Sequence, residues 1–305
     1  MTCGSISTCL MSRAMLPTTS RMRPMQVMVQ VTARAQTMPD LSAELPVSVR
    51  EKSRVELLAN VPALVVHPAF CALGEWQGLR APALIWMHGR TAHKELDAGR
   101  YLRLVRAGIA SVALDLPGHG ARFDQAMHNP ERTLDCVEQM VSEIDGVVEA
   151  MRATQWFDMT RLAIGGMSAG GMATLVRLCT PHPFRAACVE CTTGSFAWQR
   201  HRAMFEPQRA QRLDPIQHLD QWRALPLLVL HNTDDEWVAV EGQREFVEAL
   251  RTRASADHAT DLVTMHEYAQ TGAPYEHAGF GKFSSDAKDR HAQFLVRHLR
   301  DDVAR

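Results

Sequence analysis

The sequence predicts an α/β fold in which a mostly parallel central sheet carries helices on both faces. From about residue 45 onward, strand-like and helix-like segments alternate, which is typical of parallel sheets. Several strand-like segments are continuous apolar runs, as expected where both faces of a strand are buried. With 305 residues, of which 46% are hydrophobic, the chain can bury a substantial core.

Each expected element is read from its apolar pattern and from the residues that bound it. Strands are expected at 47–51, 61–67, 83–87, 109–116, 162–167, 186–191, 226–231 and 261–268. Helices are expected at 95–106, 133–156, 172–178, 241–253 and 284–299. In the longest of these helices, the apolar residues recur at the spacing of one helical face, so that face should pack against the sheet. No internal repeat or low-complexity linker follows residue 45, so we expect 45–305 to form one domain.

Two segments depart from this alternation. More than thirty residues, 192–224, separate two expected strands, and a structureless loop of that length is improbable in a compact domain. We therefore expect a small helical cap there. Residues 1–44 are rich in Met, Ser, Thr and Arg and carry no acidic residue before Asp40, which predicts either a disordered leader or a gene-model extension.

Charge and cysteine usage limit the classes of partner. A formal net charge of -1 gives no electrostatic reason to expect nucleic acid or an anionic membrane as a partner, and no apolar run is long enough to cross a bilayer. Seven cysteines, an odd number that falls partly within expected core elements, argue against a disulfide framework. A cytoplasmic setting is expected, and no pattern indicates an oligomeric state.

Residues 162–171 contain Gly-X-Ser-X-Gly between an expected strand and an expected helix. That context predicts a nucleophile elbow, with Ser168 at the tip of a strained strand-to-helix turn. Gly166 and Gly170 would remove the side chains that collide in such a turn. The backbone N–H of Ala169 would then point from a helix N-terminus, where developing negative charge is favoured.

A serine hydroxyl is a weak nucleophile unless a base activates it. Candidates follow in the chain order Ser, Asp, His: Asp235 lies just past the strand at 226–231, and His277 lies in a glycine-bearing loop after the last strand. Because the carboxyl ends of parallel strands face one crevice, these loops can meet at Ser168.

Taken in order, these motifs resemble the α/β-hydrolase superfamily, near the dienelactone hydrolase, acetyl esterase and prolyl oligopeptidase-like branch, from about residue 60 onward. The motifs are His88-Gly-Arg90, Asp115-Leu-Pro-Gly-His-Gly120, the elbow, His231-Asn-Thr-Asp-Asp-Glu-Trp-Val238 and His277-Ala-Gly-Phe280. The resemblance implies an α/β-hydrolase fold and a second oxyanion donor, the backbone N–H of Arg90, opposite that of Ala169. The Arg90 side chain is either solvated or placed to attract a carboxylate-bearing substrate. His88 and His119 are expected to brace their loops.

Both the acid and the base have rivals in the sequence. The family motif places the acid three residues before the valine that opens the next helix, which implies Asp235; the rival carboxylates are Asp234, Glu236 and Glu190. The rival histidines lie within expected secondary structure and not in a glycine-bearing loop: His266, His291 and His298.

The expected function is a serine hydrolase that cleaves small or medium carboxylic esters through an acyl-enzyme on Ser168. Aromatic residues of the cap, namely Trp198, Phe205 and Trp222, are expected to line the acyl pocket. No metal or organic cofactor is implied, because zinc-ligand spacings are missing and Met167 stands where a dinucleotide motif needs glycine. The alternatives are a peptidase or an acyltransferase of the same fold, or a non-catalytic binding protein on this scaffold.

Overall fold

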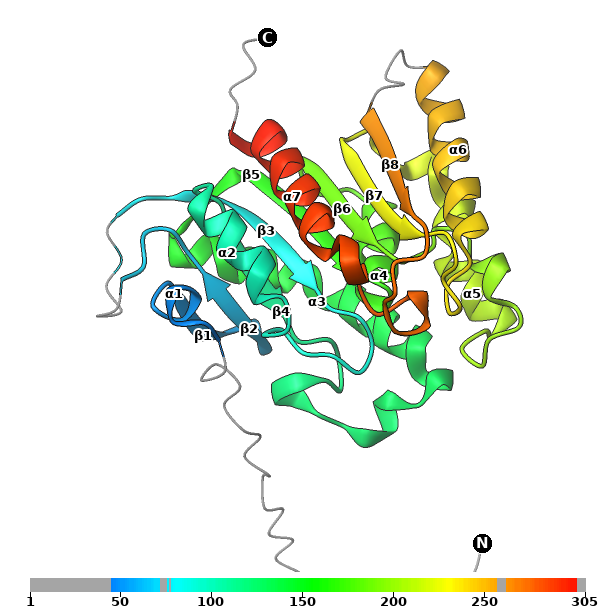
Figure 1. Cartoon of the computed structure of the whole chain (residues 1–305), viewed down its shortest axis with the longest axis horizontal. Helices are drawn as coiled ribbons and strands as arrows, with labels where there is room; N and C mark the ends of the chain where they lie inside the picture. Colours follow the sequence, from blue (N-terminus) through cyan, green and yellow to red (C-terminus); the bar gives the residue numbers. More distant parts are fainter. Residues whose placement is uncertain (1–44, 72–75, 77, 257–261, 301–305) are drawn as a thin grey trace, which may run out of the picture. The chain divides into compact units, whose positions relative to one another are not determined.

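The computed structural model describes residues 45–71, 76, 78–256 and 262–300 (Figure 1). The leader predicted at 1–44 lies outside these residues. Eight strands form one sheet in the order β1-β2-β4-β3-β5-β6-β7-β8. Strands β3 to β8 run parallel to one another, and β2 is antiparallel to both of its neighbours. The strands are β1 (Ser53–Leu58), β2 (Val61–Val66), β3 (Ala81–Met87), β4 (Ala110–Leu114), β5 (Phe157–Met167), β6 (Ala186–Glu190), β7 (Leu227–Asn232) and β8 (Val263–Tyr268).

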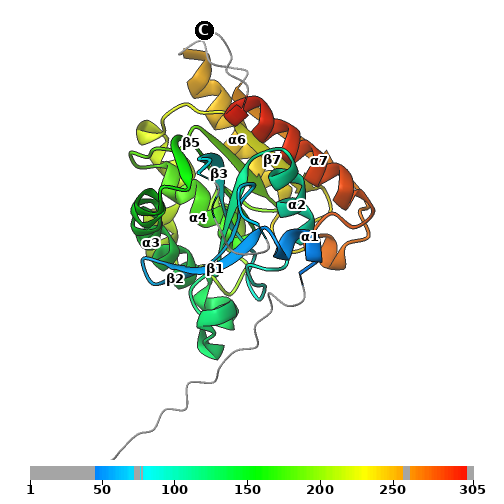
Figure 2. The same cartoon turned by 90° about the vertical axis from the view of Figure 1, so that its left-hand side faces the viewer.

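Helices cover the two faces of this sheet, as predicted. One face carries α1 (Val47–Arg50), α2 (Ala98–Arg106) and α7 (Ser284–Leu295), which continues into a π-helical turn at Val296–Arg300. The other face carries α3 (Thr133–Thr154), α4 (Ala169–Leu178) and α6 (Val240–Ala256). Figure 2, which looks from the β1 side, separates α3 from α2 and α7 across the sheet. No helix in the described ranges is both long enough and apolar enough to span a bilayer.

The core lies on both faces of the parallel strands, which explains their continuous apolar runs. All seven residues of β3 are buried, and alternate side chains enter different clusters. Ile85 and Met87 pack among the residues of α3 and α4, whereas Leu84 and Trp86 pack among those of α2 and α7. The apolar face predicted for the helix at 133–156 is buried against the sheet, which confirms that prediction.

The amino-terminal edge of the sheet differs from the prediction. The strand expected at 47–51 is wrong: those residues form α1, a single turn in which Val49 is buried and Val47 is exposed. The first strand is instead β1, which pairs with β2 across the two residues Ala59 and Asn60. Both have positive φ angles, of 48° and 68°, as a tight hairpin turn of this hand requires. Only Asn60 signals such a turn in the sequence.

The segment 192–224, between β6 and β7, contains three short helices. They are the 3₁₀ helix Phe196–Gln199, α5 (Pro207–Leu213) and the 3₁₀ helix Pro215–Gln221. Asp214 joins the first to the others, because its Oδ1 accepts a hydrogen bond from the backbone N–H of Phe196 at 2.9 Å. Further 3₁₀ turns lie in loops at the carboxyl ends of β4 and β8: Gly120–Arg122, Gln125–His128, Pro130–Arg132, Pro274–Glu276 and Gly281–Phe283.

Candidate active site

A cavity of about 990 Å³ lies at the carboxyl ends of the parallel strands. The loops after β3, β5 and β8 line it, and they bring Arg90, Ser168 and His277 to one place. After β3 the chain forms β4 on one side of β3, and it then crosses over to form β5 on the other side of β3. Ligands of open parallel sheets bind at such a reversal of strand order.

Ser168 sits in a sharp turn between β5 and α4. Its φ and ψ angles are 51° and -117°, in a region that non-glycine residues rarely occupy. A Cβ on Gly166 would lie 2.4 Å from the carbonyl carbon of Gly170, and one on Gly170 would lie 2.3 Å from the carbonyl oxygen of Met87. Both glycines are therefore required by close backbone approaches, as the elbow motif predicts.

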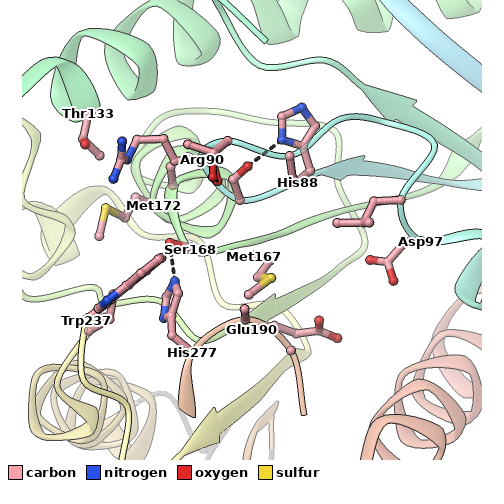
Figure 3. Close-up of a pocket in the computed structure, with 18 of the residues that line it drawn as sticks. His88, Arg90, Asp97, Thr133, Met167, Ser168, Met172, Glu190, Trp237 and His277 are labelled. Atoms are coloured by element: carbon pink, nitrogen blue, oxygen red, sulfur yellow. Dashed lines mark hydrogen bonds between the residues drawn. The ribbon is translucent and has the colours of Figure 1, made fainter. Parts of the chain in front are cut away.

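A chain of hydrogen bonds links Ser168, His277 and Asp235. The Ser168 hydroxyl lies 2.9 Å from Nε2 of His277, and the other ring nitrogen, Nδ1, lies 2.8 Å from Oδ2 of Asp235 (Figure 3). With the Nδ1 proton donated to the carboxylate, Nε2 is free to accept the proton of the hydroxyl. The structure thus brings together three residues that are far apart in the sequence.

Asp235 is fixed by its own turn. Its Oδ1 accepts hydrogen bonds from the backbone N–H groups of Trp237, at 2.9 Å, and Val238, at 2.8 Å. The side chain is buried, whereas its neighbours Asp234 and Glu236 are exposed. The third rival carboxylate, Glu190, pairs with an arginine instead. Of the candidate acids, Asp235 is the one that contacts His277.

The His277 loop is held by backbone contacts and by aromatic packing. The side-chain amide of Asn232 donates to the carbonyl oxygens of Glu276, at 2.6 Å, and Gly279, at 2.9 Å. The Trp237 ring lies 4.9 Å from the imidazole, centroid to centroid, and also stacks against the ring of Tyr275 at 4.8 Å. These contacts fix the direction of the imidazole toward Ser168.

The rival histidines have other environments. His266 packs against Tyr268 within β8, and His298 packs against Phe294. His291 is buried, contacts Arg100 and lies 5.2 Å from the Trp86 ring. Each of the three is accounted for by packing within its own region.

The loop after β3 places Arg90 in the cavity. His88 braces that loop: its Nδ1–H donates to the carbonyl oxygen of Gly89 at 2.7 Å, and its Nε2 accepts from the N–H of Leu116 at 3.1 Å. Burial lowers the pKa of His88 to about 4, so the ring is neutral and both bonds persist at neutral pH. His119 makes a similar contact, from Nδ1 to the carbonyl oxygen of Pro117 at 2.8 Å.

Contrary to the prediction, the aromatic residues Trp198, Phe205 and Trp222 do not line the cavity. Trp222 is buried in the core with its ring against Phe246. Phe205 packs against the same hydrophobic core cluster that contains Trp222 and Phe246. Trp198 is 42% exposed and donates a hydrogen bond to Glu245. The part of the cap that does reach the cavity is the turn after Trp198, with Gln199, His201, Arg202, Ala203 and Met204. Sequence reasoning missed these residues because most of them are polar, like any solvated turn.

The cavity has two ends, on opposite sides of Ser168 (Figure 3). At the paired end, defined by Asp97, Arg100, Glu190 and Lys288, Arg100 lies 2.8 Å from the carboxylate of Glu190 and 3.2 Å from that of Asp97. Burial raises the pKa of Glu190, although Arg100 opposes that shift. The arginine end, defined by Arg90, Arg202 and Gln199, meets the cap. Across the described residues, no group of three or more His, Cys, Asp or Glu side chains is arranged to hold a metal ion.

Comparison with known proteins places this geometry in a family. The model of the prolyl oligopeptidase family matches residues 100–302, about two thirds of the chain. The chain belongs to the prolyl oligopeptidase family. The Esterase YjfP of Escherichia coli (strain K12) is 26% identical to it over 211 residues, which are 63% of this chain and 82% of that protein.

Solved structures share the fold at lower sequence identity. A puromycin-hydrolyzing peptidase of Mycobacterium tuberculosis is 19% identical with a TM-score of 0.65; the match covers 84% of this chain but only 41% of the peptidase. The esterase 2 of Thermogutta terrifontis, phosphoramylated by tabun, is 18% identical with a TM-score of 0.59, over 82% of this chain and 97% of the esterase. These matches confirm the α/β-hydrolase fold, and the family match together with the esterase relative identifies the chain as a serine hydrolase.

Proposed function

We propose that the chain hydrolyses small carboxylic esters through an acyl-enzyme formed on Ser168. The hydrogen-bond chain from Asp235 through His277 to Ser168 carries this proposal. Ser168 Oγ attacks the ester carbonyl carbon while Nε2 of His277 takes the hydroxyl proton. The same proton passes to the leaving alcohol. Water, activated by His277, then attacks the acyl-enzyme, releases the carboxylic acid and restores Ser168.

The oxyanion of each tetrahedral intermediate is assigned to two backbone N–H groups, those of Ala169 and Arg90. Ala169 is the first residue of α4, where N–H groups have no partner within the helix. Arg90 follows Gly89, where a Cβ would lie 3.5 Å from the Cβ of Ser168, so this stretch of backbone passes beside the nucleophile. One such donor contributes about 2.7 to 4 kcal/mol to transition-state stabilisation. Each step uses groups of the protein and water only.

Esters are the favoured substrate class, with peptides as the alternative. Support for esters comes from the esterase relative, of which this chain covers 82%. Support for peptides comes from the family model and from the puromycin-hydrolyzing peptidase, of which this chain spans less than half. An amide nitrogen must be protonated before it leaves, whereas an ester oxygen leaves more readily. Comparing an ester and an amide of the same acyl group therefore distinguishes esterase from peptidase activity.

The test combines active-site labelling with turnover. A fluorophosphonate should label the wild-type protein and fail to label Ser168→Ala, because the reagent requires an activated serine. Turnover of p-nitrophenyl butyrate should fall by roughly 10⁶-fold in Ser168→Ala. The p-nitroanilide of the same acyl group, assayed in parallel, should be cleaved far more slowly; equal rates would favour the peptidase alternative.

Histidine variants provide the matched control. His277→Ala should abolish ester turnover, whereas His266→Ala, on the half-buried edge strand β8, should retain it. Labelling that persists in folded Ser168→Ala, or full activity in His277→Ala, would contradict the proposed triad.

We also propose a cytoplasmic location. The support is chemical: the four buried cysteines Cys136, Cys179, Cys188 and Cys191 are free thiols, and free thiols suit a reducing compartment.

A further inference from the structure

The cavity lining carries more cations than carboxylates. Four side chains of the lining are Arg or Lys and two are Asp or Glu: Arg90, Arg100, Arg202, Lys288, Asp97 and Glu190. Both carboxylates lie at the paired end, where they face Arg100 and Lys288. The excess positive charge therefore belongs to the arginine end.

Arg90 and Arg202 bond only to neutral acceptors among the described residues. The guanidinium of Arg90 donates to the carbonyl oxygen of His128, and that of Arg202 donates to the carbonyl oxygen of Glu236 at 3.4 Å. Neither has a carboxylate oxygen within 4.0 Å in the part of the chain that the structure describes, whereas Arg100 has two such partners. In Figure 3 the guanidinium of Arg90 points toward Thr133, away from the paired end.

Both guanidinium-bearing residues line the same cavity. Burial lowers the pKa of Arg90, and the positive charge of Arg202 lowers it further. Two like charges in a partly buried cavity are unfavourable unless an anion lies between or beside them. The carboxylate of Glu131 opposes this shift in the pKa of Arg90 from beyond ion-pair distance, so neither guanidinium of the arginine end has a directly paired anion among the described residues.

A third donor at the same end lacks an acceptor. Gln199 lines the cavity, is 1% exposed, and its amide nitrogen is buried without a hydrogen-bond partner among the described residues. Unpaired buried donors cost about 1–3 kcal/mol each, so they are rare unless a ligand or water pairs with them. Gln199 lies beside Arg202, whose backbone N–H donates to the Gln199 carbonyl oxygen at 2.9 Å, although the amide nitrogen itself has no surface exposed to the cavity.

We propose that the arginine end binds a carboxylate of the substrate, so that the preferred substrates are anionic esters. Planar guanidinium groups pair with carboxylates through two parallel hydrogen bonds, which fixes the ligand as well as attracting it. The carboxylate stands either on the acyl part, as in a half-ester of a dicarboxylic acid, or on the alcohol part, as in an ester of a hydroxy acid. This inference rests on the proposed ester hydrolysis and narrows its substrate class.

The test uses substrate pairs that differ in charge alone. On the acyl side, monoethyl glutarate is compared with ethyl glutaramate, in which a neutral amide replaces the carboxylate. On the alcohol side, 3-(butanoyloxy)propanoate is compared with its amide. In at least one arm, kcat/KM for the anion should exceed that for the amide by about tenfold in the wild-type protein.

Variants of Arg202 then test whether the preference for the anionic substrate over the amide depends on the arginine end. The anion-to-amide ratio should fall to about one in Arg202→Gln, as the second guanidinium is lost, and should invert in Arg202→Glu. Arg200→Gln is the matched control, because Arg200 lies in the same turn, is exposed and does not line the cavity. Its ratio should stay within about twofold of the wild-type value.

The outcomes separate the two proposals. Equal rates on anion and amide in both arms, with turnover still dependent on Ser168, would overturn the carboxylate site and leave ester hydrolysis standing. The carboxylate site would also be overturned if the wild-type protein prefers the anion over the amide and the Arg202→Glu variant, with an unchanged melting temperature, keeps that preference. Absence of Ser168-dependent labelling and turnover would instead overturn the proposed function.

Discussion

Both ends of the cavity contain arginine side chains, but only at the paired end do these pair with carboxylates of the described residues. At the paired end, Arg100 is buried, lies 3.9 Å above the Trp86 ring and faces two carboxylates. At the arginine end, Arg90 and Arg202 are only partly buried and donate to backbone carbonyls. The first arrangement is complete within the protein and therefore belongs to the fold. The second is incomplete, and incomplete polar groups beside a nucleophile are where a ligand is recognised.

The elements that supply the two ends explain the difference. Arg100 comes from α2 and Glu190 from the end of β6, and both elements are packed into the core. Arg90 and Arg202 come from a loop and from the cap, where backbone can adjust to a substrate. If this comparison is correct, changes at the paired end should affect stability, and changes at the arginine end should affect substrate choice.

The largest expected effect on stability is at the paired end. Glu190→Gln removes a buried negative charge while keeping the shape of the side chain, and Arg100 then loses one of its two partners. Because a buried Arg100 charge with Asp97 as its one remaining carboxylate partner is costly, the free energy of unfolding should fall by about 3 kcal/mol, measured by urea denaturation. Arg202→Gln should change it by no more than about 0.5 kcal/mol.

Equal losses in these two variants would break the comparison. A further check is the double replacement Arg100→Met with Glu190→Met, which removes both charges and should recover much of the stability lost in Glu190→Gln.

The next effect concerns acid stability and His88, which lies on the same side of Ser168 as the paired end in Figure 3. Its pKa is about 4 in the folded protein and about 6.5 when unfolded. The unfolded chain therefore binds a proton first as the pH falls below 6.5, and stability is lost progressively toward pH 4. Between pH 7 and pH 5, wild-type protein should lose about 2 kcal/mol more than His88→Gln. The measurement is urea denaturation at both pH values; parallel losses would show that His88 is not the group responsible.

The catalytic residues could be predicted from the sequence because each is dictated by local geometry. The turn at Ser168 requires glycine at positions 166 and 170, and both glycines can be read directly from the sequence. Asp235 requires the turn that lets its carboxylate accept two N–H groups from the residues that follow. The strand pattern then brings these loops to one edge of the sheet. Their catalytic roles stay predictions until the variants are assayed.

The hairpin and the cavity lining could not be predicted, because neither is decided by local pattern. Ala59 adopts a positive φ only because β1 and β2 pair around it. Arg90 and Arg202 are remote in sequence, and Arg202 reaches the cavity that Arg90 lines because of how the cap packs. The prediction of Trp198, Phe205 and Trp222 as lining residues was wrong because large aromatic side chains in a cap can equally attach it to the core. Trp222 does so through Phe246, and Phe205 through the same cluster.

The smallest expected effects are those of two cap variants on ester turnover, and they test how far the arginine end extends. Trp198 immediately precedes Gln199 but points to Glu245 on α6, so Trp198→Ala should leave kcat/KM for ethyl glutaramate and monoethyl glutarate within about twofold of wild type. Met204, in the same turn, lines the cavity, and Met204→Ala should raise KM for a neutral butyrate ester by up to about tenfold through lost apolar contact. Assays of both variants against the same ester series would test this. A larger loss in Trp198→Ala than in Met204→Ala would mean that the substrate extends across the outer face of the cap, and the arginine end would have to be redrawn to include Trp198.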